Sequence, residues 1–259
     1  MSDPSPGRAD ASEATSPGRD PEAEWRPSPN VDSRRGAEPS LIVLHYTGMA
    51  SADEALAWLR DPRSKVSAHY FVFEDGRLVQ SVDETERAWH AGLSGWHQIR
   101  DVNAASIGVE IANPGHDHGY QEFPEPQIAA TIGLVKRIMA RWQIAPEGVV
   151  AHSDVAPGRK IDPGEKFPWE RFAAAEIGRY VSPSPIMDGS ALVVGDVGQP
   201  VARLQRSLAS LGYPIEETAS YDTYTETVVA AFQRHYRPER IDGRADRSTL
   251  ATLERLASE

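Results

Sequence analysis

The sequence predicts an α/β protein: a mixed central β-sheet flanked by helices, followed by a small domain of three helices. Three observations support this prediction. Short apolar runs typical of strands alternate with amphipathic stretches up to about residue 180. One pair of these runs flanks a turn signal and indicates a hairpin. Beyond about residue 190, only helical periodicity remains. We therefore expect two folded domains in the chain of 259 residues.

The N-terminal segment, residues 1–36, is rich in Pro, Ser, Gly, Asp and Glu and has almost no large aliphatic residues. Such a segment cannot bury enough apolar surface to offset its ordering entropy. We expect it to be a disordered tail, in which Trp25 is the side chain that could anchor it on the domain. The first domain is then expected to span residues 37–180.

The elements of this domain follow from local patterns. "LIVLHY" (41–46) is a continuous apolar run typical of a buried strand. Ser51 can cap the short helix that follows it. Residues 69–82 form two strand-like runs around Asp75-Gly76, which suits a type I′ hairpin turn. "SIGVEI" (106–111) is expected to be a further strand.

The second half of the domain and the C-terminal region are also periodic. Apolar residues at steps of three and four from Ile128 to Trp142 predict an amphipathic helix. "GVVAH" (148–152) predicts a strand, and "FPWERFAAAEIGRYV" predicts a closing helix. The Pro/Ser-rich stretch 181–190 is expected to be a linker. Residues 191–259 carry three apolar stripes, which predict three short helices.

The composition limits the classes of partner. The formal net charge of −11 argues against a nucleic-acid-binding protein and against electrostatic docking on an anionic membrane. No run approaches the ~20 apolar residues of a membrane span. The first twenty residues lack the apolar stretch of a secretory signal, so we expect a cytoplasmic protein. We also expect a monomer. A trimmed or mis-assigned start would instead allow the periplasm or cell envelope.

Three residues suggest a metal site. His45 and His152 stand where strands are expected to end, and Asp162 follows His152 by ten positions. A catalytic zinc takes three such ligands and a water, and the chain has no cysteine that could offer another type of site. The spacing alone also fits ordinary histidines. Glu110 and Lys160 could supply a base and a cation, or form a strand-end ion pair and a solvated charge.

Five motifs occur in register: "VLHYTGM", "SAHYFV", "AWHAG", "SIGVEIAN" and "VVAHSDVAPGRKIDPG" followed by "FPW". Together they resemble the zinc-dependent N-acetylmuramoyl-L-alanine amidases of the amidase-2 group, the AmpD/AmiD type, over residues 28–180. The resemblance implies cleavage of the amide between the lactyl group of N-acetylmuramic acid and L-alanine, in peptidoglycan or in muropeptides.

The resemblance also implies residue roles. The zinc ligands would be His45, His152 and Asp162. Glu110 would be the catalytic glutamate, and Lys160 would lie near the scissile carbonyl. The resemblance places His69 and His90 near the cleft, as substrate-binding or structural residues. Asp154 and Arg159 are expected to brace the loop between His152 and Asp162. For Asp154, a role in orienting a metal ligand also stays open.

The C-terminal region resembles a three-helix peptidoglycan-binding domain, through "VARLQRSLASLGY", "VVAAFQRHY" and "IDGRADRSTLATLERL". It departs from that family at "YDTYTET" (221–227), where a glycine-containing turn is usual. A helical cap without a ligand therefore stays open for this domain.

Two further functions stay open for the whole chain: a peptidoglycan-recognition protein without activity, and a zinc amide hydrolase with another acyl substrate. We expect "HDH" (116–118) to be a solvated loop rather than a second metal site.

Overall fold

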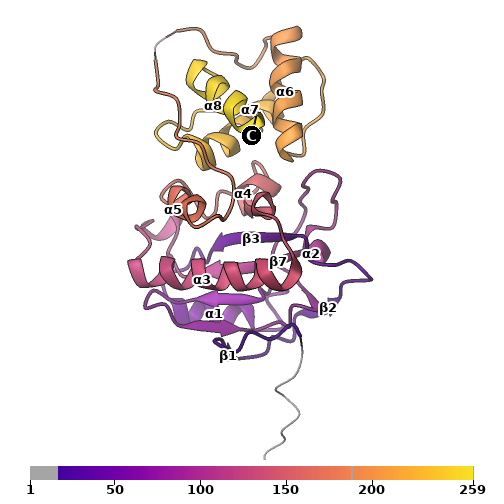
Figure 1. The fold of residues 1–259 in the computed structure, drawn as a ribbon, viewed down its shortest axis with the longest axis vertical. Coiled ribbons are helices and arrows are strands. Elements are labelled where there is room, and N and C mark those ends of the chain that lie inside the picture. Colours follow the sequence, from indigo (N-terminus) through magenta and orange to yellow (C-terminus); the bar gives the residue numbers. More distant parts are fainter. Residues whose placement is uncertain (1–16, 188, 259) are drawn as a thin grey trace, which may run out of the picture.

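The computed structural model describes residues 17–187 and 189–258 (Figure 1). A mixed sheet with the strand order β1-β5-β4-β7-β3-β8 forms its centre, which confirms the predicted fold class. Every neighbouring pair of strands is parallel except β4 and β5. The strands are β1 (Glu24–Trp25), β3 (Leu41–Tyr46), β4 (Tyr70–Val72), β5 (Leu78–Gln80), β7 (Ser106–Ile111) and β8 (Val149–Ala151).

The two faces of the sheet bury different partners because side chains alternate along each strand. Ile42, Leu44, Val109 and Ile111 pack with helix α3 (Glu125–Trp142) on one face. On the other face, Phe71 packs with Leu56 of helix α1 (Ala52–Leu59). His45 and Glu110 alternate with the residues of the α3 face, so they lie on the face opposite α3.

Local signals set several element ends. The Ser51 hydroxyl accepts a hydrogen bond from the Glu54 N–H and caps α1, as expected. Helix α3 ends where Gln143 adopts a left-handed conformation with φ of 54°. The β4–β5 hairpin is present, but its turn is not type I′, because only Gly76, and not Asp75, has positive φ. A Cβ on Gly76 would lie 2.9 Å from the Pro126 carbonyl oxygen, so the turn also needs glycine for space.

Smaller elements complete this domain. Strands β2 (Val31–Ser33) and β6 (Glu86–Ala88) form an antiparallel pair. The remaining helical segments are α2 (Val102–Ala105), η1 (His116–His118), η2 (Pro146–Gly148), α4 (His152–Val155) and α5 (Trp169–Ala174). The expected closing helix is thus shorter than its pattern, because α5 ends at Ala174.

The expectation of a disordered tail through residue 36 is wrong for residues 17–36, and residues 1–16 lie outside the described part of the chain. Strand β1 pairs with β5, and the buried carboxylate of Asp20 binds Arg137 and Arg141 of α3. The guanidinium of Arg34 is buried and donates to the carbonyl oxygens of Glu84, Ala104 and Ser106. Polar contacts, rather than apolar burial, order this segment, and composition does not reveal them.

The C-terminal domain consists of α6 (Gln199–Leu211), α7 (Thr223–Tyr236) and α8 (Arg247–Ala257). Its apolar stripes pack together, and the same buried cluster includes Val150, Val155 and Ala156 of the sheet domain. The turn that lacks the usual glycines is formed by other means. Ala219 adopts a left-handed conformation with φ of 58°, and the Asp222 carboxylate caps α7.

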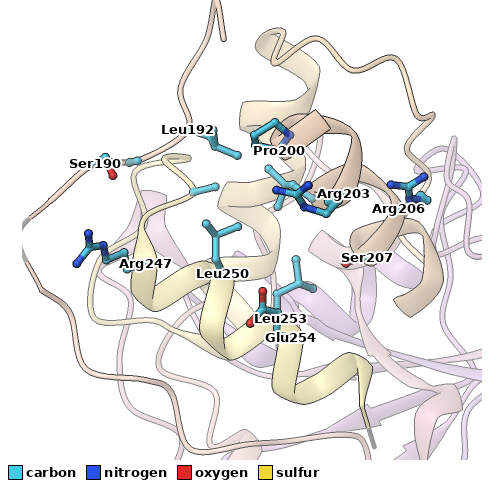
Figure 2. A pocket seen from close by; sticks show the side chains of 13 residues that line it. Ser190, Leu192, Pro200, Arg203, Arg206, Ser207, Arg247, Leu250, Leu253 and Glu254 are labelled. Carbon is cyan, nitrogen blue, oxygen red and sulfur yellow. The ribbon is translucent and has the colours of Figure 1, made fainter. Parts of the chain in front are cut away.

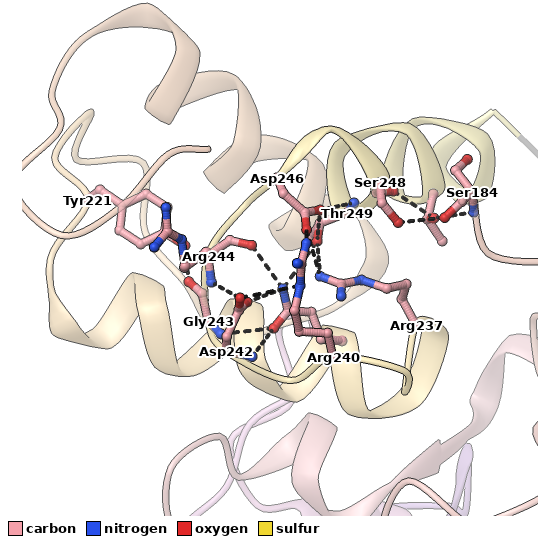
Figure 3. A network of polar contacts seen from close by, with 12 residues as sticks. Ser184, Tyr221, Arg237, Arg240, Asp242, Gly243, Arg244, Asp246, Ser248 and Thr249 are labelled. Atoms are coloured by element: carbon pink, nitrogen blue, oxygen red, sulfur yellow. Dashed lines mark hydrogen bonds and ion pairs between the residues drawn. The ribbon is translucent and has the colours of Figure 1, made fainter. Parts of the chain in front are cut away.

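The segment expected to be a linker is fastened to α8. The Ser184 carbonyl accepts from the Ser248 hydroxyl, and the Ser184 N–H donates to Thr252. Figure 3 shows this contact beside a cluster in which Arg237 and Arg240 surround Asp246. Asp246 also caps α8, so one carboxylate joins the ends of two helices. The segment between the two domains is therefore held against the C-terminal domain.

Among the described helices, none is both long and apolar enough to cross a membrane.

Replacing Arg34 with Met tests the ordering of the N-terminal segment. The change would leave three buried carbonyl oxygens without their donor, and each costs about 1–3 kcal/mol. We expect the free energy of unfolding in urea to fall by about 3 kcal/mol or more. Arg35→Met, at the exposed neighbour, should leave it unchanged. Equal unfolding curves for the two variants would contradict the role given to Arg34.

Candidate active site

The expected site residues gather at one edge of the sheet. Strands β3, β7 and β8 are parallel, so their carboxyl ends lie together. His45 is in register with Glu110 on the neighbouring strand. His152 follows β8 directly, as the first residue of α4. Asp162 reaches the same place from the loop after α4, because the Ser153 N–H holds its carbonyl oxygen at 2.9 Å.

Three atoms of these side chains face one another. His45 Nδ1 lies 2.8 Å from His152 Nδ1 and 3.1 Å from Asp162 Oδ2. His152 Nδ1 lies 2.9 Å from the same oxygen. All three side chains are buried. Within the described residues, this is the only group of three or more His, Cys, Asp or Glu residues with metal-binding spacing.

The surrounding hydrogen bonds assign the protons away from this centre. His152 Nε2 lies 3.2 Å from the Ala91 carbonyl, which can only accept, and 3.5 Å from Arg159 Nη2, which can only donate; the shorter contact assigns the proton to Nε2. Ser106 donates its hydroxyl proton to the Val102 carbonyl and therefore accepts from His90 Nε2. His90 Nδ1 must then accept from His45 Nε2, at 3.0 Å. Both Nδ1 atoms are left with lone pairs that point at the carboxylate.

This arrangement fits a divalent cation. Three lone-pair donors with no proton between them repel one another unless a positive charge lies among them. The ligands of a tetrahedral zinc at ~2.0–2.1 Å lie ~3.3 Å apart, close to the separations seen here. Burial, with the nearby His152, lowers the pKa of His45 to about 4, which keeps the ring neutral. The donor set of two imidazoles and one carboxylate is one that zinc accepts.

Glu110 supplies a carboxyl group beside this centre. Its Oε2 atom is buried and has no hydrogen-bond partner among the described residues. Burial, together with the charge of Asp162, raises the pKa of Glu110 well above its usual range, and Lys160 acts in the opposite direction. A carboxyl group with a raised pKa and a free oxygen suits proton transfer.

A cavity of about 560 Å³ opens over these residues. His45, Glu110, His152, Lys160 and Asp162 line its polar part. Its apolar part is formed by side chains to which the sequence analysis gave no role in the site, namely Met49, Trp58, Leu59, Val66, Trp89 and Ile161. Trp58 is 47% exposed although it belongs to α1. Its place off the apolar stripe of that helix is the signal that could have identified it.

His90 is joined to the site by its hydrogen bond with His45. Its ring packs against the backbone of Gly108, where a Cβ would lie only 2.4 Å from His90 Cγ. Glycine at position 108 therefore makes room for the ring. His90 also lines the cavity, as expected for a residue near the cleft.

Of the two roles expected for His69, substrate-binding or structural, the structure favours the structural one. Its ring is fully buried and does not line the cavity. The Gly108 N–H donates to its Nδ1 atom, and burial lowers its pKa to about 3. His69 is thus a core residue between β4 and β7, because its side chain points into the protein behind the cavity.

The other polar residues of the sequence motifs have structural contacts. Arg159 donates to the carbonyl oxygens of Ala91 and Leu93 and so braces the loop between His152 and Asp162, as expected. The 116–118 loop is exposed, as expected for a solvated loop, but His116 has partners. Its ring binds the Tyr46 hydroxyl at 2.9 Å and the Glu165 carboxylate at 3.1 Å.

A second cavity, of about 660 Å³, lies on the C-terminal domain between α6 and α8. Figure 2 shows Leu192, Leu250 and Leu253 along it, with Arg203 and Arg247 at its sides. Arg206 also lines it but is paired with Glu217 at 3.2 Å. Neither Arg203 nor Arg247 has an ion-pair partner within residues 17–187 and 189–258.

Comparisons with known families agree with these observations. Residues 35–165 match the Amidase_2 family of N-acetylmuramoyl-L-alanine amidases. Residues 197–253 match PG_binding_1, a peptidoglycan binding domain family. The resemblance inferred from the five motifs and from the C-terminal helices is thereby confirmed.

Individual proteins match over most of their length. The N-acetylmuramoyl-L-alanine amidase AmiD of Escherichia coli is 37% identical over 243 residues, which cover 87% of each chain. The 1,6-anhydro-N-acetylmuramyl-L-alanine amidase AmpD of Haemophilus influenzae is 32% identical over 167 residues, 57% of this chain and 89% of AmpD. The solved structure of E. coli AmiD with anhydro-N-acetylmuramic acid-L-Ala-D-gamma-Glu-L-Lys covers 90% of this chain and 92% of its own, at 35% identity and a TM-score of 0.72.

Proposed function

Because the chain belongs to the family of N-acetylmuramoyl-L-alanine amidases, we propose that it is a zinc-dependent amidase that cleaves muropeptides between the lactyl carbonyl and L-alanine. The observation that carries the zinc dependence is the convergence of three unprotonated donor atoms within 3.1 Å of one another. The same site holds a buried carboxyl and a lysine, which an amide hydrolysis needs.

His45 Nδ1, His152 Nδ1 and Asp162 Oδ2 would hold the zinc ion. Zinc held there would polarise the scissile carbonyl and lower the pKa of water from ~15.7 towards ~7. The protein contributes the orientation of the ligands. His90 and the Ala91 carbonyl fix the tautomers of the two histidines, so that both Nδ1 atoms face the ion.

Glu110 would move the proton. Its free Oε2 atom accepts a proton from a water molecule while the oxygen of that water forms a bond to the lactyl carbonyl carbon. Glu110 Oε2 then gives the proton to the alanine nitrogen as the carbon–nitrogen bond breaks. A raised pKa makes Glu110 a better proton acceptor than a carboxylate in water, and it makes the return step possible near neutral pH.

Lys160 would stabilise the negative charge that develops on the carbonyl oxygen. It lines the same cavity and is close enough to act on the pKa of Glu110 and of His45. It stands two residues after Gly158, which has a φ of 76°, on the loop between His152 and Asp162. Trp58 and Val66 offer apolar surface for the sugar and the peptide.

Two features bear on the substrate. The AmiD structure contains an anhydro-muropeptide, and AmpD is named for the same sugar, which supports anhydro-muropeptides as a substrate of this chain. The C-terminal domain suits larger peptidoglycan. Its α6–α8 groove combines an apolar floor with Arg203 and Arg247, which fits the free carboxylates of stem peptides.

Replacing Glu110 with Gln tests the catalytic role. The amide keeps the shape of the side chain but cannot accept the proton, so turnover should fall by ~10²–10⁴-fold. Muropeptide cleavage would be followed by mass spectrometry, and zinc content by metal analysis. We expect one zinc per chain in both the parent and the variant, and no cleavage by the parent after chelation. Glu147→Gln, an exposed change, should retain full activity. Parent-like turnover in Glu110→Gln would contradict the assignment.

Replacing Lys160 with Met should change both turnover and its pH dependence. Loss of an oxyanion donor typically costs ~10²–10³-fold in turnover. Lys160 also lowers the pKa of Glu110, so its removal should raise that pKa further. The active carboxylate is lost as the pH falls through the pKa, and the acid limb of kcat/KM should therefore move to higher pH. Lys136→Met, on the outside of α3, provides the charge-matched control. An acid limb of kcat/KM that stays in place or moves to lower pH in Lys160→Met would refute the role of Lys160.

Charge reversal at the groove tests the C-terminal domain. Glu110→Gln is used as the background, so that insoluble peptidoglycan is not digested during the binding assay. We expect Arg203→Glu with Arg247→Glu to lower the affinity about tenfold or more, because two charge-assisted hydrogen bonds are lost. In the active protein, the same changes should leave cleavage of soluble muropeptides intact. Arg35→Glu serves as the control, and unchanged sedimentation with peptidoglycan would favour a helical cap without a ligand.

A further inference from the structure

A buried polar network joins the C-terminal domain to the helix that carries His152. The carboxylate of Asp154 is fully buried. Its Oδ1 atom accepts from the Tyr213 hydroxyl at 2.7 Å. Its Oδ2 atom accepts from His235 Nδ1 at 2.7 Å and from the Ala151 N–H at 2.9 Å. Two of the three donors belong to the C-terminal domain.

Both C-terminal donors are held firmly in place. The His235 ring stacks on Trp169 of α5, with ring centroids 3.8 Å apart, and on Tyr236 at 3.9 Å. The Tyr213 ring packs edge-on against Trp96 at 5.3 Å. Burial beside Asp154 raises the pKa of Tyr213 well above its usual range, so its hydroxyl stays a donor. The network can therefore fix the position of Asp154.

A small movement of Asp154 would shift helix α4 and, with it, the metal-binding atoms. Helix α4 has only four residues, which is too short to be stable without tertiary contacts. His152 is its first residue, and Ser153 holds the backbone of Asp162. Two of the three metal-binding side chains thus depend on the position of α4. Figure 1 shows α4 between the sheet and the C-terminal helices.

The loop after α4 is also in contact with the C-terminal domain. A Cβ on Gly158 would lie 2.6 Å from Thr227 of α7, so the backbone of the loop closely approaches that helix. Val155 and Ala156 belong to the buried apolar cluster formed mainly by the C-terminal helices. The segment from His152 to Asp162 is therefore packed between the two domains.

We propose that the C-terminal domain is a positioning part of the catalytic unit: Tyr213 and His235 hold Asp154, and through α4 they orient His152 Nδ1 towards the other metal-binding atoms. This inference rests on the proposed zinc site. It gives the domain a role separate from peptidoglycan binding, because neither residue lines the α6–α8 groove or the catalytic cavity. Tyr213 and His235 do not touch the reacting atoms, so their effect is expected in the metal affinity.

Tyr213→Phe provides the first test, since it removes the hydroxyl and keeps the ring. Zinc affinity would be measured on the full chain by competition with a chromophoric chelator. Loss of a residue that supports a metal ligand typically costs ~10–100-fold in affinity, and we expect a loss in this range. At saturating zinc, kcat should fall while KM stays unchanged, because the cavity lining is intact.

Tyr221→Phe is the matched control. Tyr221 is another buried tyrosine of the C-terminal domain, but its hydroxyl donates to the Gly243 carbonyl within that domain. Both variants should lose a similar amount of stability, because each leaves a buried acceptor unpaired. Only Tyr213→Phe should weaken zinc binding.

A pair of variants at His235 keeps the proposal testable if Tyr213→Phe folds poorly. His235→Asn retains an N–H donor near the position of Nδ1, whereas His235→Leu has none. We expect zinc affinity to be weaker in His235→Leu and largely restored in His235→Asn.

The outcomes separate the inference from the proposed function. A parent protein that binds no zinc would overturn the zinc site itself. A parent that binds zinc, with Tyr213→Phe and His235→Leu binding equally well, would overturn the positioning role alone. Equal losses of zinc affinity in Tyr213→Phe and Tyr221→Phe would also overturn it, because general destabilisation would then explain the effect.

Discussion

The site depends on one constraint: three parallel strands end at the same edge of the sheet, and two of them place a polar side chain at that end. His45 and Glu110 stand side by side because β3 and β7 pair in register. His152 follows the end of β8, and the hydrogen bond from the Ser153 N–H to the Asp162 carbonyl brings Asp162 close to it. The burial that lowers the pKa of His45 and raises the pKa of Glu110 follows from this placement.

Much of this arrangement could be predicted from the sequence. The strand at 41–46 and the strand at 106–111 appear with the predicted bounds. His45, His152 and Asp162 were identified by residue type and spacing and by likeness to a family. The apolar side of the cavity could not be predicted in this way, because Trp58 and Val66 become neighbours only when α1 and the following loop fold over the sheet.

The expectations that differ from the structure share a physical cause. Residues 17–36 look disordered by composition, yet Asp20 and Arg34 order them through hydrogen bonds to partners distant in the chain. His69 belongs to a family motif near the cleft, but its ring is directed into the core by the Gly108 N–H. Both cases depend on hydrogen bonds between residues distant in the chain, which neither periodicity nor composition reveals.

Position 108 has a consequence for how such a protein can vary. The ring of His90 occupies the volume where a side chain on residue 108 would begin. A larger residue at 108 would need a smaller one at 90, and that exchange would remove the partner of His45. The two positions share one space and should therefore covary in natural sequences. In a directed-evolution library, neither should be randomised without the other.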